Sequence, residues 1–98
     1  MTISGKEYEI PKMNFSNVCR LEQWGIAMDN MAARPLSLMA GFVSLAIGGK
    51  TLPDGEAAID AHLAAGGALD DIANALNDAI NNSDFFKNQT GEKKPVKG

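Results

Sequence analysis

The chain has 98 residues, of which 45% are apolar, 21% charged and 6% aromatic, a composition that excludes a multidomain enzyme and a wholly unfolded chain. Alanine supplies 14 of the apolar residues, so we expect a thin core whose stability a partner completes. The net charge of −3 combines an acidic body, with 11 acidic against five basic side chains through Phe86, and a basic end, and an acidic body argues against binding to nucleic acid.

A short β-hairpin is predicted at the start of the chain. Thr2–Ser4 and Tyr8–Ile10 alternate apolar and polar residues on either side of Gly5-Lys6, a two-residue turn whose glycine can adopt positive φ. Pro11 ends the second strand. Because a two-stranded ribbon is marginal alone, we expect it either to pack on the helices or to offer an edge to another chain.

The first helix is predicted to follow Asn14 or Ser16, either of which can cap it, and to end at Gly25. Its apolar side chains gather on one side and comprise Phe15, Val18, Cys19 and Leu21, with Trp24 one turn further. Residues 26–34 show no clear period, so they are expected to form a connector or a short helix.

The central helix is predicted over Pro35–Ile47, where proline suits the first turn and Gly48-Gly49 follows the end. Apolar residues occupy two faces, which indicates a buried helix: one face carries Leu36, Met39, Val43 and Ile47, the other Leu38, Phe42 and Leu45. The Thr51–Gly55 stretch that follows is predicted to be a turn.

Two further helices are predicted before the basic end. The third is rich in alanine from Ala57 to Ala65 and breaks at Gly66-Gly67. The fourth has the clearest helical period, from Leu69 to Ile80, with two aspartates in its first turn. We therefore expect a mainly α (α+β) fold, with the hairpin followed by a compact bundle of about four helices. Residues 1–86 would form one domain and residues 87–98 a flexible, disordered basic tail.

No pattern in the sequence is typical of catalysis. Gly49-Lys50-Thr51 lacks the upstream glycine and the strand of a phosphate-binding loop, and His62, the only histidine, has Ala58 and Gly66 as helical neighbours instead of metal ligands. His62 is expected to be an ordinary surface or half-buried residue, and Cys19 a small buried one. We therefore expect no enzyme activity, no cofactor and no metal site.

The expected compartment is a reducing cytoplasm. One cysteine allows no internal disulfide. The alternating start of the chain does not have the form of a secretory signal, and Pro35–Ile47 is shorter than the roughly 20 residues that a membrane helix requires. No contact with a membrane is expected.

The residues expected to contact a partner are large apolar groups in excess of what one helix face needs to bury. They are Trp24, Leu38, Phe42, Phe85 and Phe86, any of which could instead belong to the core. The Asp84-Phe85-Phe86 stretch has the further alternative of folding back as a hydrophobic lid on the last helix.

The order of these features resembles that of the tail assembly chaperones of long-tailed bacteriophages. The resemblance rests on the Gly5-Lys6-Glu7-Tyr8 start, which continues to Ile10, and on the acidic helix with its lysine-rich end, from Asp70 to Lys97. The alanine-rich third helix, with its Gly66-Gly67 break, has no counterpart in the pattern.

The resemblance implies a protein of the bacterial host cytoplasm that coats the long helical tape-measure protein, keeps it soluble and hands it to tail-tube subunits. It also implies self-association and, in many members, a longer product made by ribosomal frameshifting. The Lys93-Lys94 pair is compatible with a slippery, adenine-rich codon run at which such a frameshift occurs. The alternatives are a structural virion protein of the head-tail joining or tail-terminator type and, with less support from the acidic body, a small DNA-binding regulator or an antitoxin-like module.

Overall fold

The computed structural model describes residues 1–89 except residues 28, 30 and 32. It begins with the predicted hairpin, in which β1 (Thr2–Ile3) pairs antiparallel with β2 (Lys6–Glu7). The turn is Ser4-Gly5, one residue earlier than expected, and both of its residues have positive φ, 53° and 81°. Positive φ at both positions corresponds to a type I′ turn, and the glycine occupies its second position instead of the expected first. Residues 8–10 are not a strand, although the Tyr8 N–H donates to the Met1 carbonyl.

Helix α1 (Phe15–Gln23) begins where the sequence predicts, because the Asn14 side chain accepts the N–H of Asn17. Val18 and Leu21 are buried, whereas Cys19 is only half-buried.

Helix α2 (Pro35–Ile47) has both predicted ends, with proline in its first turn and Gly48 in the left-handed conformation after its last residue. Seven consecutive residues of α2, Leu38 to Ser44, are buried. The apolar residues on both faces thus predicted a central helix correctly.

Helix α3 (Leu52–Ala64) starts inside the segment predicted to be a turn. The Asp54 carboxylate accepts the N–H groups of Lys50 and Thr51, and Pro53 lies in the first turn, where its missing N–H is not needed. Gly55 lies against α2, where an added Cβ would overlap the carbonyl of Ala40. Pro-Asp-Gly is therefore a helix start here, and its glycine serves close helix packing instead of a turn.

Helix α4 (Leu69–Asn81) follows the predicted bounds closely, and Asp71 accepts the N–H of Ala68 at its start. A short fifth helix, α5 (Asp84–Gln89), was not predicted. It includes residues 87–89, which were expected in the tail; the rest of that tail lies outside the described residues.

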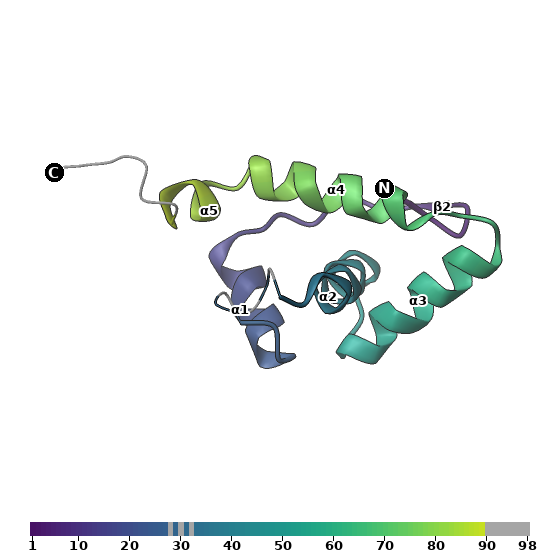
Figure 1. Ribbon diagram of the computed structural model, residues 1–98, viewed down its shortest axis with the longest axis horizontal. Coiled ribbons are helices and arrows are strands. Elements are labelled where there is room, and N and C mark those ends of the chain that lie inside the picture. The colour runs from purple at the N-terminus through teal and green to yellow at the C-terminus, as the bar shows by residue number, and fades with distance from the viewer. Residues whose placement is uncertain (28, 30, 32, 90–98) are drawn as a thin grey trace, which may run out of the picture.

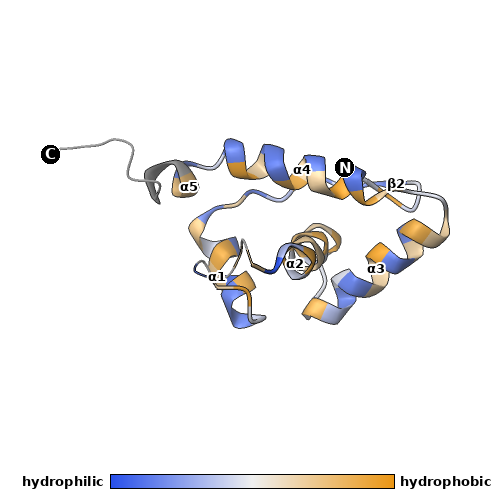
Figure 2. Ribbon diagram, in the orientation of Figure 1, coloured by the Kyte–Doolittle hydropathy of each residue, from blue (hydrophilic) through white to orange (hydrophobic). Residues whose placement is uncertain are grey.

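Helices α1, α3 and α4 pack against α2. Figure 1 shows α2 end-on between α1 and α3, with α4 crossing over them and α5 continuing beyond its end. Figure 2 shows apolar residues on the side of α4 that faces α2 and hydrophilic residues on the opposite side. The largest fully buried side chains mark the centre of this core: Phe42, Met13, Leu21, Ile26, Ile72 and Val43. No single helix in the described ranges is long and apolar enough to cross a membrane; by length and composition only α2 and α3 together would qualify, as a pair bent by 93°.

Candidate functional site

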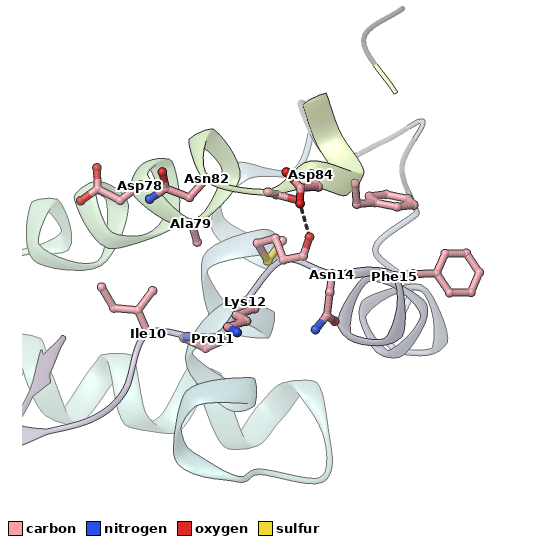
Figure 3. A pocket seen from close by; sticks show the side chains of 12 residues that line it. Ile10, Pro11, Lys12, Asn14, Phe15, Asp78, Ala79, Asn82 and Asp84 are labelled. Atoms are coloured by element: carbon pink, nitrogen blue, oxygen red, sulfur yellow. Dashed lines mark hydrogen bonds between the residues drawn. The ribbon is translucent and has the colours of Figure 1, made fainter. Parts of the chain in front are cut away.

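An open groove of about 550 Å³ lies between the linker that precedes α1 and the end of α4 (Figure 3). One wall is the extended linker with the first residue of α1, and the other is the last turns of α4 with the start of α5. The lining residues comprise Ile10, Pro11, Lys12, Met13, Asn14 and Phe15 on the first wall, and Asp78, Ala79, Asn82, Ser83, Asp84 and Phe85 on the second.

The linker wall is held in place although it has no regular secondary structure. Met13 is 1% exposed and anchors the linker in the core. The side chain of Asn17 donates to the Lys12 carbonyl over 2.6 Å, and the Asn14 side chain accepts the N–H of Asn17 over 2.9 Å. These contacts fix the direction in which the linker enters α1.

Ser83 ties the two walls together. Its buried hydroxyl donates to the Met13 carbonyl (dashed line, Figure 3) and accepts the N–H of Phe86 over 3.2 Å. One side chain therefore satisfies a linker carbonyl and a donor at the start of α5. The groove is preformed, because its two walls are joined by this bond and not only by side-chain packing.

Aromatic rings form one end of the groove. Phe15 and Phe85 meet edge to face with ring centres 5.9 Å apart, and Phe85 and Phe86 do the same at 5.3 Å. Phe15 is nonetheless 68% exposed, and Ile10, at the other end of the linker wall, is 40% exposed. Large apolar side chains left in water beside a preformed groove are typical of a surface that binds a partner.

The charges of the groove differ between its walls. Asp78 and Asp84 on the α4–α5 wall are exposed, and the linker wall carries Lys12. Among the described residues, the Met1 amino group forms an ion pair with Glu7, and His62 lies within hydrogen-bond distance of Asp71; neither contact involves the groove. The α4–α5 wall is therefore an acidic rim above an apolar floor.

The structure places the five expected partner-binding residues in three different environments. Phe85 lines the groove and Phe86 packs against it, both half-buried. Leu38 and Phe42 are core residues, 7% and 0% exposed, because they lie in the buried middle of α2, between Leu38 and Ser44. In this fold their side chains are not available to a partner. Trp24 is half-buried elsewhere.

Trp24 lines a separate depression of about 350 Å³ with Arg20 and with the Gly48–Lys50 turn. The pair of basic residues there, Arg20 and Lys50, would suit an anion, but the turn offers it no free donors. The N–H groups of Gly49 and Lys50 are bonded to the Ser44 carbonyl and the Asp54 carboxylate, both over 2.8 Å, and the turn lies at the negative end of α2. The groove is therefore the stronger candidate.

Sequence reasoning missed Phe15 and Ile10 as surface residues. Phe15 shares the apolar side of α1 with Val18 and Leu21, and it was not among the residues expected to contact a partner. Helical side chains point back toward the N-terminus of their helix, so a residue in the first position covers space beyond the helix end, where α2 does not reach. The position of Phe15 immediately after the capping Asn14 was the signal that could have predicted its exposure.

His62 is buried, contrary to expectation, at 5% exposed. Its Nδ1 accepts the N–H of Ser4 over 2.9 Å, and its Nε2 lies 3.1 Å from the Asp71 carboxylate, so the ring is neutral with its proton on Nε2. The ring faces the backbone of Gly67, where an added Cβ would overlap it. This histidine joins the hairpin to α3 and α4. The hairpin therefore packs on the helices, which is the first of the two arrangements expected for it.

The described part of the chain contains no group of three or more His, Cys, Asp or Glu residues placed to hold a metal ion. The lowered pKa values belong to carboxylates with structural roles. Backbone N–H groups of Lys50 and Thr51 lower the pKa of Asp54, and the N–H of Ala68 followed by His62 lowers that of Asp71.

Comparisons of the chain with protein-family models, curated proteins and solved structures give no match. The case for a function therefore rests on the sequence pattern and on the groove.

Proposed function

We propose that this protein is a tail assembly chaperone of a long-tailed bacteriophage, which binds the tape-measure protein in the cytoplasm of the host and has no catalytic role. The observation that carries the proposal is the preformed groove with exposed apolar side chains on a small acidic domain. The resemblance over Gly5–Ile10 and Asp70–Lys97 supplies the identity of the partner.

The proposed activity is protection of an apolar surface. A tape-measure protein is a long helix whose apolar side chains are exposed until tail-tube subunits surround it. A groove that already has its bound shape can cover such side chains at a low entropic cost. Release to the tube subunits then requires only that they cover the same side chains over a larger area. Self-association, and a longer frameshifted form that recruits tube subunits, belong to the same proposal.

Co-expression with the tape-measure protein of the same phage tests this function. We expect the tape measure to stay in the soluble fraction and to co-purify with the chaperone, whereas it should be insoluble when it is expressed alone. A tape measure that remains insoluble and unbound in the presence of the chaperone would refute the proposal.

The runner-up, a structural virion protein, makes a different prediction about purified particles. A chaperone acts before the tube closes, so we expect mass spectrometry of mature virions to detect none of this chain. Detection at a fixed number of copies for each particle would favour the head-tail joining or tail-terminator alternative.

A further inference from the structure

We infer that the groove between the linker and the end of α4 binds an amphipathic α-helix that has a row of lysines or arginines beside its apolar stripe. The inference rests on the proposed function, because it names the surface and the chemistry through which a helical partner is held. It is carried by three properties of the groove: its open form, its apolar exposure and the charge of its rim.

The open form favours a macromolecular occupant over a small molecule. Small-molecule sites enclose most of the ligand surface, whereas here the Phe15 ring at one end of the groove is 68% exposed. Ile10 and Phe15 project from the two ends of the same linker wall, with Ala79 between the labelled side chains of the opposite wall (Figure 3). Apolar contacts spaced along such a wall suit side chains at positions i, i+3 or i+4 and i+7 of a helix.

The rim charges favour a basic flank on that helix. Asp78 and Asp84 stand on the α4–α5 wall, on an exposed helix face and at a helix start, so cationic side chains of a partner lying along the groove would meet them. The same charges oppose a second copy of this chain. A copy bound groove to groove would bring together two grooves that each carry two aspartates against one lysine, and the body through Phe86 carries 11 acidic against five basic side chains.

Fluorescence anisotropy with two designed peptides tests the inference on the full chain. Both peptides are 18-residue helices with the same leucine stripe, one flanked by lysines and the other by glutamates. We expect the lysine peptide to bind, and the glutamate peptide to bind at least about tenfold more weakly at low salt. Failure of the lysine peptide to bind, or equal binding of the two, would overturn the inference.

The variant Phe15→Ser tests the site itself. We expect it to weaken binding of the lysine peptide roughly tenfold, because it removes an exposed aromatic anchor. Leu36→Ser is the matched control: Leu36 is 66% exposed and does not line the groove, so its loss should leave the affinity unchanged. Equal affinity of the wild-type and Phe15→Ser chains would show that the peptide binds elsewhere.

A charge reversal tests the rim without removing an apolar contact. Asp78→Lys should reduce or invert the preference for the lysine peptide, whereas Asp60→Lys, on an exposed face of α3 outside the groove, should not. An unchanged preference in Asp78→Lys would contradict the role of the rim. Two other results would also overturn the inference. If the protein forms a dimer that Phe15→Ser dissociates, the occupant of the groove is a second copy of the chain. If the peptide binds only after residues 90–98 are deleted, the occupant is the chain's own lysine-rich end.

These outcomes are independent of the co-expression test. If the tape measure is kept soluble by Phe15→Ser as well as by the wild type, the function stands and the groove assignment fails. If the lysine peptide binds through Phe15 but the tape measure is not held, the groove assignment stands and the proposed function fails.

Discussion

His62 bonds to two elements besides its own helix, and it does so with both ring nitrogens. Nδ1 accepts from the hairpin turn and Nε2 donates to the first turn of α4, while the ring itself belongs to α3. Each bond fixes the protonation state that the other requires. A second proton on Nδ1 would place two donors against each other at Ser4, so the hairpin is held only by the neutral ring.

Replacement His62→Phe keeps an aromatic ring in this place and removes both hydrogen bonds. We expect a loss of about 1–3 kcal/mol in the free energy of unfolding, because the Ser4 N–H loses its acceptor in a partly buried position. Urea unfolding followed by circular dichroism measures the change. The control is Asp71→Asn, which keeps an oxygen acceptor for the Nε2 proton and should cost less. A His62→Phe chain as stable as the wild type would show that the ring contributes only by packing.

At the scale of the helices, the closest approach is between α2 and α3. Gly55 presents no side chain to α2, and a Cβ there would overlap backbone atoms of Ala40 and approach those of Ser44, which cannot rotate away. Gly41, on α2, is also enclosed, but there the nearest atoms belong to the side chains of Leu21 and Ile26. Of these two glycines, only Gly55 is therefore required by a backbone contact between two helices.

Gly55→Ala sets helix propensity against packing. Propensity alone would make the alanine chain more stable by up to about 1 kcal/mol. The overlap with α2 should reverse the sign and destabilise the protein by about 1–3 kcal/mol, as overpacking does. Thermal unfolding distinguishes the two results, with the exposed neighbour change Glu56→Ala as a control that should alter little. A higher melting temperature for Gly55→Ala would mean that the helices separate at no cost.

The elements that the sequence predicted well are those whose signals are local. The periods of α2 and α4, the cap at Asn14 and the glycines that follow α2 and α3 all act within a few residues. The start of α3 was missed because Pro53-Asp54-Gly55 is compatible with a turn and with a helix start, and the contact with Ala40 that selects the helix is distant in the sequence. Helix α5 is too short to show a period.

The groove was only partly predictable for the same reason. Phe85 and Phe86 were identified because they lie outside the period of α4, a local observation. Nothing local shows that Ser83 bonds to Met13, 70 residues away, or that Phe15 lies beside Phe85. The burial of Leu38 and Phe42 was not predictable either, because only the packing of α1, α3 and α4 around α2 shows which of its apolar residues are covered.

For the whole molecule, the lowered carboxyl pKa values determine how stability depends on pH. The bond from the amino terminus and that from Thr2 lower the pKa of Glu7, and backbone N–H groups lower those of Asp54 and Asp71, from ordinary values of 4.5 and 3.8. At these three carboxyl groups the folded chain therefore binds protons less readily than the unfolded chain. The stability that these groups contribute is complete above about pH 5 and is lost as the pH falls through the ordinary values toward the lowered ones.

Acid unfolding measures this contribution. We expect the midpoint of thermal unfolding to decrease below about pH 5, and the decrease to be shallower in the double variant Asp54→Asn, Asp71→Asn, which cannot lose charges at these two helix starts. The variant Asp60→Asn, exposed on α3 and not a cap, is the control and should follow the wild type. Identical acid profiles for the wild-type and double-variant chains would contradict the assignment.

The bond between Ser83 and Met13 also sets when the groove can exist during synthesis. Its linker wall is translated before α2, α3 and α4 and its other wall only after most of α4, so a nascent chain that ends before α4 holds Phe15 and Ile10 without the surface that they complete. Chains fold from the N-terminal end as they emerge, yet this surface must wait until the residues through Phe85 have been made. An incomplete translation product would therefore lack the groove and could not compete with finished molecules for a partner.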